Sequence, residues 1–287
     1  MRLAVLGEGG LGVAGSHADA RTVLAQIDGF CDAVPRLRAR AEEYGSLVLF
    51  VTEGPGWPYY ARPVTGVPRE PVTAEHVRTV RARQRELRVP ESFEWLEESA
   101  PEMGAAAAAA GLSVTAHPLL LLDGPPQAAP LPPGVTVRSI PADDQDLAQI
   151  MSVPDVAFAH PGTSPGTAGP AERDKLARRR DPASIARIRA LLHAGHSVLA
   201  AAFGDDGPLA AGSCQSTGGV AEITGVGTLP SDRRRGLGAA VTAELARLAL
   251  AHGTHTVFLS ASDESVARVY ARLGFRRAGT AMIAEPH

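Results

Sequence analysis

The sequence predicts an α/β (α+β) protein built in two halves, and three observations support this fold class. Strand-like and helix-like segments alternate in a regular order over the last 150 or so residues. Residues 73–121 look like a faded repeat of the end of the chain. Between these regions, residues 123–134 are rich in proline and glycine and cannot propagate a helix or a central strand. We therefore expect two domains, residues 1–130 and 131–287.

In the second half, hydrophobic periodicity and turn residues predict the order β-α-α-β-β-β-α-β-α-β. The ten segments are strand 135–140, helices 143–159 and 182–193, strands 197–203, 209–215 and 221–229, helix 236–251, strand 256–260, helix 264–273 and strand 275–284.

The most informative motif is residues 233–238, RRRGLG, which lies between a strand-like run and a helix-like run. The missing side chains of Gly236 and Gly238 let a phosphate approach the backbone. The N-terminal end of the helix and the arginine side chains favour the negative charge of the phosphate. The motif predicts a pyrophosphate cradle. The alternative is a solvated arginine run before an ordinary helix.

This motif resembles the acyl-CoA loop Arg/Gln-x-x-Gly-x-Gly/Ala of the GNAT acyltransferase superfamily, whose fold has the same order of elements. A second segment, residues 263–275, is similar to the family pattern Asn-x-x-Ala-x-x-x-Tyr-x-x-x-Gly-Phe. In it Asp263 replaces the usual Asn and Val266 the usual Ala, whereas Tyr270 is in register. The resemblance implies a tandem GNAT-like fold with a mixed, mostly antiparallel central sheet flanked by helices.

The resemblance also implies two catalytic residues. Glu222 lies in an Ala-Glu-Ile sequence fourteen positions before Gly236, as the base glutamate of histone acetyltransferases of this superfamily does, and would accept the amine proton through water. Tyr270 would protonate the departing thiolate of CoA. Each residue also has a structural alternative. Glu222 could be a strand-end carboxylate that faces solvent. Tyr270, on an inward helix face with Val269 and Leu273, could be a core tyrosine with a satisfied hydroxyl.

Acetyl-CoA is the co-substrate that the resemblance implies, and no metal is expected. Backbone N–H groups at the end of the strand would face the acyl carbonyl and the pantetheine. The residues expected to bind it are Val226, Gly227, Thr228, Leu229, Arg233, Arg234, Arg235, Gly236, Leu237, Gly238, Ala239, Asp263 and Ser265.

The expected reaction is acetyl transfer from acetyl-CoA to the primary amine of a small molecule by direct attack. The alternative is a non-catalytic acyl-CoA-binding or regulatory module with an interaction domain. The irregular residues 158–170 are expected either to cover the acceptor pocket, where His160 would touch the substrate, or to form a mobile linker.

The first half carries the pattern of the second half without its chemistry. Residues 73–87 and 101–110 are helix-like, and residues 92–96 and 113–122 are strand-like. When Gly111 is set against Gly274, Ala107 falls opposite Tyr270, and the preceding residues 63–68 contain no glycine cradle. We interpret this half as a degenerate GNAT-like domain that is a partner and not a second catalyst.

At the start of the chain, residues 7–12 form a formal G-x-G-x-x-G after a short apolar run. A dinucleotide site also needs an acidic residue at the end of a second strand about 20 residues later. Residues 21–40 look helical instead, and the next apolar strand is 47–51. A glycine-rich N-terminus is the favoured interpretation.

The composition gives 28 basic and 31 acidic residues and a formal net charge of −3. The largest basic cluster outside the cradle, residues 178–180, is flanked by Asp174 and Asp181, which does not indicate a nucleic-acid surface. Cys31 and Cys214 fall in different halves and offer neither a disulfide framework nor a metal spacing. Without a long apolar span or a signal peptide, a cytoplasmic protein without membrane partners is expected, with a homodimer as one possible assembly.

Overall fold

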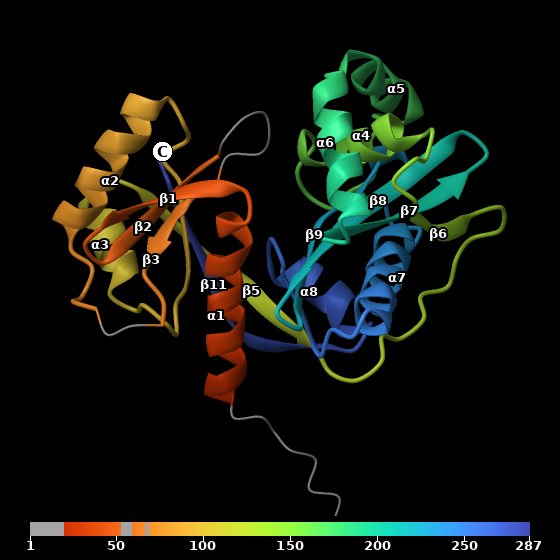
Figure 1. Ribbon diagram of the computed structural model, residues 1–287. Coiled ribbons are helices and arrows are strands. Elements are labelled where there is room, and N and C mark those ends of the chain that lie inside the picture. Colours follow the sequence, from red (N-terminus) through yellow and green to blue (C-terminus); the bar gives the residue numbers. More distant parts are fainter. Residues whose placement is uncertain (1–19, 53–58, 67–68) are drawn as a thin grey trace, which may run out of the picture.

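The computed structural model describes residues 20–52, 59–66 and 69–287, so the glycine motif of residues 7–12 lies outside the described residues. The described chain forms one eleven-stranded sheet with helices on both of its faces (Figure 1).

The N-terminal half begins with a long helix that is followed by strands and two further helices. Its elements are α1 (Ala20–Arg36), β1 (Ala39–Tyr44), β2 (Leu47–Thr52), β3 (Ala61–Pro63), α2 (Ala74–Leu87), β4 (Phe93–Leu96), α3 (Met103–Ala109) and β5 (Ser113–Leu122).

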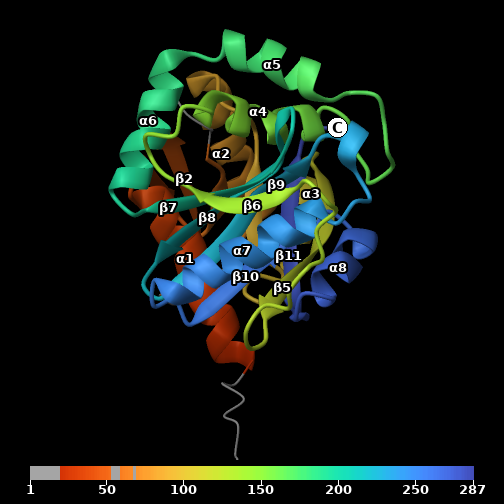
Figure 2. The same ribbon diagram turned by 90° about the vertical axis from the view of Figure 1, so that its right-hand side faces the viewer.

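The C-terminal half has three consecutive helices after its first strand. Its elements are β6 (Thr136–Ile140), α4 (Leu147–Phe158), α5 (Pro170–Arg179), α6 (Pro182–His193), β7 (Ser197–Gly204), β8 (Gly207–Thr217), β9 (Val220–Thr228), the short 3-10 helix η1 (Pro230–Asp232), α7 (Leu237–Ala251), β10 (Thr256–Ser260), α8 (Glu264–Ala271) and β11 (Phe275–Glu285). Figure 2 shows α4, α5 and α6 grouped on one side of these strands and α7 on the other.

The two halves share their last strands. The strand order is β1-β2-β3-β4-β11-β5-β10-β9-β8-β7-β6, so β11 lies between β4 and β5, and β5 lies between β11 and β10. The β5–β11 ladder is antiparallel and runs from the Phe275–Leu122 pair to the Glu285–Ser113 pair. Among the strand pairs of the described residues, only β3–β4 and β9–β10 are parallel. The sheet is therefore mostly antiparallel and continuous, and the proposed domain boundary near residue 130 falls in the connection between β5 and β6.

Helix α1 lies between the two halves of the sheet (Figure 1). Its apolar side chains pack in one cluster with residues from both halves, and the rings of Phe30 and Phe258 meet edge to face with centroids 5.3 Å apart. The cluster comprises Val23, Ile27, Phe30, Val34, Leu96, Leu119, Leu121, Val220 and Phe258. Because these side chains belong to both halves, α1 connects them through a shared core.

Most elements coincide with the segments predicted from the sequence, including β5, α6 and β10. The helix expected over residues 21–40 is an exception, because α1 ends at Arg36 and β1 follows. Residues of β1 pair with β2 across a turn at Gly45, whose φ of +62° favours glycine. This pairing overrides the local helical pattern of the segment.

Helix α5 was not expected from the sequence. Pro170 stands in its first turn, and the side chain of Glu172 accepts a hydrogen bond of 2.8 Å from the N–H of Gly169. Proline in the first turn and an acidic residue that returns to the cap are ordinary start signals of a helix. The order of the C-terminal half is therefore β-α-α-α-β-β-β-α-β-α-β.

Within the described ranges, no helix has the length and apolar character needed to cross a bilayer.

Candidate functional site

The strands β9 and β10 separate in the middle of the sheet. Their parallel pairing is confined to three residue pairs and ends at Phe258 and Glu222. Farther along, β9 continues to pair with β8, and β10 pairs with β5. The β8–β9 register shifts where Gly225, with a φ of +65°, forms a bulge. One edge of residues 223–228 therefore has no strand partner among the described residues, which suits an extended ligand.

The predicted cradle follows directly after η1. Arg234 has a φ of +62° and Gly236 a φ of +80°, so two left-handed residues alternate with right-handed or extended ones. Such an alternation directs successive N–H groups to one side and forms an anion-binding nest. The first helical bond of this region runs from Ala240 N to Gly236 O at 3.0 Å. The six N–H groups of residues 234–239 have no acceptor in the part of the chain that the structure describes.

Close packing explains both glycines of the cradle. A Cβ atom at Gly236 would lie 3.2 Å from the carbonyl oxygen of Pro130, and one at Gly238 would lie 3.2 Å from Oγ1 of Thr228. The connection between the halves therefore touches the cradle, and the end of β9 touches the first turn of α7. Larger residues at either position would need a shift of these neighbours.

Arg233 does not point into the cradle. Its guanidinium donates to three backbone carbonyl oxygens at the end of α4 and in the following segment, those of Ala157 at 2.9 Å, His160 at 2.6 Å and Ser164 at 3.2 Å. The first residue of the motif thus holds the α4–α5 segment in place.

The other two arginines of the cradle differ from each other. Arg235 forms an ion pair with the carboxylate of Asp232. Arg234 is exposed and is without a side-chain partner among the described residues. The free anion-binding groups of the cradle are therefore its backbone N–H groups and the side chain of Arg234.

Several residues at the end of β9 make packing and backbone contacts that the sequence does not indicate. The N–H of Leu229 donates to the carbonyl of Leu209 at 2.9 Å, so the expectation that Leu229 offers a free N–H is wrong. A Cβ atom at Gly227 would lie 2.8 Å from Cα of Pro154 in α4. Gly227 therefore allows α4 to pack closely on β9, and Val226 packs beside Gly238.

Glu222 lies at the point where β9 and β10 separate. It projects to the same side of the sheet as Val220, which packs under α1, because alternate residues of a strand share a face. The side chain keeps partial solvent access, but the surrounding protein raises the pKa of its carboxyl to about 7 through burial. A carboxyl with a pKa near neutrality suits a general base. This environment disfavours the alternative of a strand-end carboxylate facing solvent.

Tyr270 joins α8 to the first turns of α7. Its ring packs against Phe275, with centroids 6.2 Å apart. Burial raises the pKa of its hydroxyl to about 12, and a hydrogen bond with Thr242 opposes this shift. Thr242 in turn donates to the carbonyl oxygen of Gly238 at 2.9 Å. The phenol is therefore a protonated group at neutral pH, connected to the cradle through one fully buried threonine.

The inward face of α8 differs in one residue from the expectation. Val269 is 36% exposed, whereas Ala267 and Leu273 are buried beside Tyr270. Asp263 caps the helix and accepts hydrogen bonds from the N–H of Ser265 at 2.7 Å and from its hydroxyl at 2.5 Å. Both of these predicted cofactor residues therefore contact each other and help to start α8.

The segment between α4 and α5 is fixed to η1. The N–H of Gly166 donates to Pro230 O at 2.9 Å, and the N–H of Ser231 donates to Ala168 O at 3.0 Å. These bonds, with those of Arg233, disfavour a mobile linker. His160 is exposed, and its Nδ1 lies 2.9 Å from the carbonyl oxygen of Val156.

Sequence reasoning missed three residues close to the predicted site: Thr242, Glu94 and Arg62. Thr242 is a polar residue on the buried face of α7, a signal that is visible in the sequence. Glu94 stands between Phe93 and Trp95, an alternation that ordinarily predicts an outward-facing side chain. Only the arrangement of the two halves shows that Glu94 and Arg62 lie near Glu222.

Comparisons with known proteins agree with this geometry. The family model described as FR47-like protein matches residues 200–283. A GCN5-related N-acetyltransferase from Kribbella flavida has 25% sequence identity and a TM-score of 0.64, over 93% of this chain and 95% of that chain. A tandem GNAT protein from the clavulanic acid biosynthesis pathway has 16% identity and a TM-score of 0.51, with the same two coverages. No curated protein matches the sequence.

These similarities confirm the resemblance of the C-terminal half to the GNAT superfamily. They also confirm the tandem GNAT-like fold of the chain. It is a fold that supports acyl transfer in general.

Proposed function

We propose that the protein is an acyl-CoA-dependent N-acyltransferase that transfers an acetyl group from acetyl-CoA to the primary amine of a small molecule by direct attack. The six free N–H groups of residues 234–239 are the observation that carries this proposal. They form a nest at the start of α7, where the helix dipole also favours an anion, and a pyrophosphate has the charge and the acceptors to fill it. The separated edge of β9 suits the pantetheine.

The proposed chemistry needs a neutral amine. An alkyl amine with a pKa of about 10.4 is mostly protonated at pH 7, and removing its proton costs roughly 4–5 kcal/mol. Glu222, with a pKa of about 7, would accept this proton directly or through water. Acetyl-CoA supplies the activated acyl group when it is bound.

Tyr270 is the proposed proton donor for the departing sulfur. Its hydroxyl is un-ionised at neutral pH because burial raises its pKa to about 12. Its neighbour Thr242 donates to the carbonyl oxygen of Gly238 in the first turn of α7, so the phenol lies near the cradle. The Tyr270 hydroxyl would therefore lie close to the end of the pantetheine, where it could donate its proton to the thiolate.

Calorimetry with acetyl-CoA, followed by an amine screen that measures thiol release, tests the proposal. We expect one acetyl-CoA per chain, because the N-terminal half has no cradle, and CoA release that depends on an amine. Acetyl-CoA binding without thiol release for any amine would favour the non-catalytic binding module. Absence of acetyl-CoA binding would refute the cradle.

A further inference from the structure

Each half places a charged side chain where its parallel strand pair ends. Glu222 is the last residue of β9 that pairs with β10. Arg62 follows Ala61, the one residue of β3 that pairs with β4 in the described chain. Both side chains face α1, since Arg62 forms an ion pair with Asp28 of that helix and Val220 places Glu222 on the same side of the sheet.

These two residues belong to a half-buried polar cluster between the halves, which we call the interdomain cluster: Arg62, Glu94, Glu222, Cys31 and Tyr60. Glu94 lies two residues before Leu96, which packs against α1, and therefore faces the same side. The Tyr60 hydroxyl donates to the carbonyl oxygen of Cys31 at 3.0 Å. Glu222 is close enough to act electrostatically on Glu94, Cys31 and Tyr60. Charged and polar residues of both halves thus lie close to one another beside α1.

The interdomain cluster contains polar atoms without partners. The side chain of Arg62 is 1% exposed, and its Nε and Nη1 atoms have no hydrogen-bond acceptor among the described residues. Oε1 of Gln215, which stands opposite Glu222 in β8, is buried without a donor. Leaving buried donors and acceptors unpaired is costly. A ligand that offers both hydrogen-bond acceptors and donors would satisfy these atoms.

The interdomain cluster also contains carboxyl groups that have no cationic partner among the described residues. Asp28 already pairs with Arg62, so the two carboxyls of Glu94 and Glu222 have no cation of their own in the described chain. When both carboxyls are ionised, the interdomain cluster has more negative than positive charge. A buried carboxylate without a partner is unstable, so a cationic ligand is favoured.

We propose that the interdomain cluster is the acceptor site and that it takes a hydroxylated diamine. Glu222 accepts the proton of the reacting amine, and Glu94 of the N-terminal half binds the second amino group as an ammonium ion. Hydroxyl oxygen of the acceptor receives hydrogen bonds from Arg62, and Gln215 accepts one from an amino group. This proposal rests on the proposed acyltransferase function and gives the N-terminal half a direct part in acceptor binding.

The proton state of Glu94 supplies a readout that is independent of turnover. Burial and the charge of Glu222 raise the pKa of Glu94 to about 8, Glu285 adds to this shift, and Arg62 opposes it. In the empty site Glu94 is therefore mostly protonated at pH 7. An ammonium ion beside Glu94 lowers this pKa, so binding of the diamine should release a proton at pH 7. Affinity should rise as the pH increases towards 8.

The test uses diaminopropanol as the hydroxylated diamine, the matched aminopropanol that lacks the second amine, and the full-length protein. In Glu94→Gln the ratio of kcat/KM for the diamine to that for the monoamine should fall about 10- to 100-fold, the loss expected for one buried charge-assisted contact. Glu75→Gln is the control, because Glu75 lies in the same half with its side chain 77% exposed. This control should leave the ratio unchanged.

Calorimetry in buffers of different ionisation enthalpy should show more proton release on diaminopropanol binding to the native protein than to Glu94→Gln, in which only Glu222 can lose a proton. An unchanged ratio of kcat/KM, or the same proton release in both proteins, would overturn the diamine site. Failure of the acyltransferase proposal is distinguishable. No amine would then release CoA, whereas proton-linked diamine binding would still test the interdomain cluster.

Discussion

The loop before α2 and the cradle before α7 occupy the same place in their halves, after a parallel-paired strand, but their chemistry is opposite. Helix α7 begins at Gly236 without any side-chain cap. Helix α2 begins at Thr73, whose Oγ1 accepts from the N–H of His76 at 3.3 Å, while the N–H of Val72 donates to Glu102 at 3.3 Å. The N-terminal half satisfies with its own side chains the groups that the C-terminal half leaves free.

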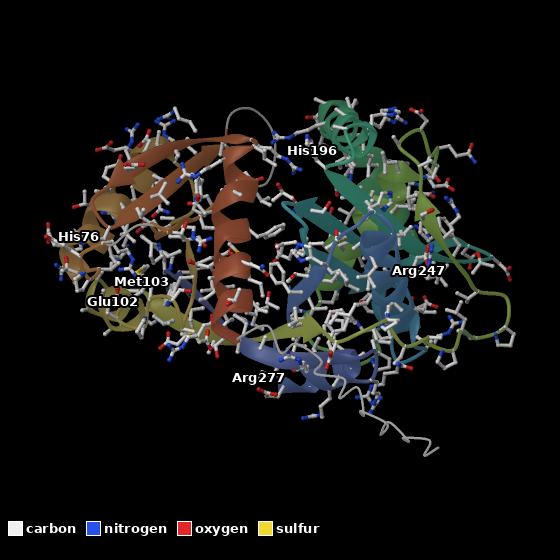
Figure 3. All side chains as sticks on the ribbon, turned by 60° about the horizontal axis from the view of Figure 1, so that its bottom comes forward. His76, Glu102, Met103, His196, Arg247 and Arg277 are labelled. Atoms are coloured by element: carbon white, nitrogen blue, oxygen red, sulfur yellow. The ribbon has the colours of Figure 1, made fainter. Side chains whose placement is uncertain are left out.

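Charge strengthens this contrast. Glu75 lies in the first turn of α2, and Glu102 accepts from Arg69 and from the N–H of Val72, so carboxylates and their partners occupy the position that an anion would need. Figure 3 shows His76, Met103 and Glu102 together in the N-terminal half. The helix that corresponds to α8 carries Ala107 where α8 carries Tyr270. In the two repeats, the start of α2 is therefore stabilised by its own side chains, whereas the start of α7 is available for a ligand.

Tyr270→Phe should give the largest effect, because it removes the proton donor and little volume. We expect kcat to fall by about 10²–10⁴ with the acetyl-CoA Kd nearly unchanged. Tyr44→Phe, which loses a 2.7 Å hydrogen bond to Glu42 in the N-terminal half, is the control and should leave kcat unchanged. If Tyr270→Phe lowers only the melting temperature, Tyr270 is a core residue.

Glu222→Gln should change the pH profile. In the native protein kcat/KM should rise as the pH increases through about 7, because the base form of Glu222 exists above its pKa. The variant should lose about 10²-fold at pH 6 and recover as the amine approaches its own pKa. A profile identical to that of the native protein would assign the proton to another residue or to water.

Gly236→Asp tests the cradle itself. It adds bulk 3.2 Å from the carbonyl oxygen of Pro130, strain at a φ of +80°, and negative charge where the phosphate should lie. Loss of two or more charge-assisted bonds should weaken acetyl-CoA binding by about 100-fold or more in calorimetry. Gly66→Asp is the matched control, since Gly66 has a φ of +75° and open space in the corresponding loop. Equal losses in both variants would point to a general folding defect.

The local features of the fold and the site were predictable because neighbouring residues encode them. The glycines of the cradle, the apolar stripe of α7 and the extent of β5 all follow from spacing within a short window. The placement of β11 between β4 and β5, two strands of the other half, was not predictable, since it depends on pairing between residues more than 150 positions apart. The position of α1 between the halves, and with it the approach of Glu94 to Glu222, follows from this placement.

The contact of Arg233 shows the same limit at the scale of one side chain. The motif predicts a phosphate ligand, whereas the structure gives the guanidinium three carbonyl acceptors in a segment about 70 residues away in sequence. The residues around Arg233 in the sequence do not predict these carbonyl acceptors. They indicate only a side chain that can donate several hydrogen bonds in fixed directions.

Arg233→Lys should give the smallest effect and the clearest division between the two binding sites. A lysine ammonium cannot reproduce the planar fork that reaches Ala157, His160 and Ser164, so the α4–α5 segment should loosen. If this segment covers the acceptor, KM for the amine should rise about 3- to 10-fold, the loss of one or two exposed hydrogen bonds, while the acetyl-CoA Kd changes less than about 2-fold. Arg247→Lys, which keeps a positive charge beside Glu244 on the exposed side of α7, is the control and should change neither value. If Arg233→Lys instead weakens acetyl-CoA binding as strongly as Gly236→Asp does, the Arg233 side chain turns into the cradle when the ligand binds, and the phosphate role that the sequence indicates is restored.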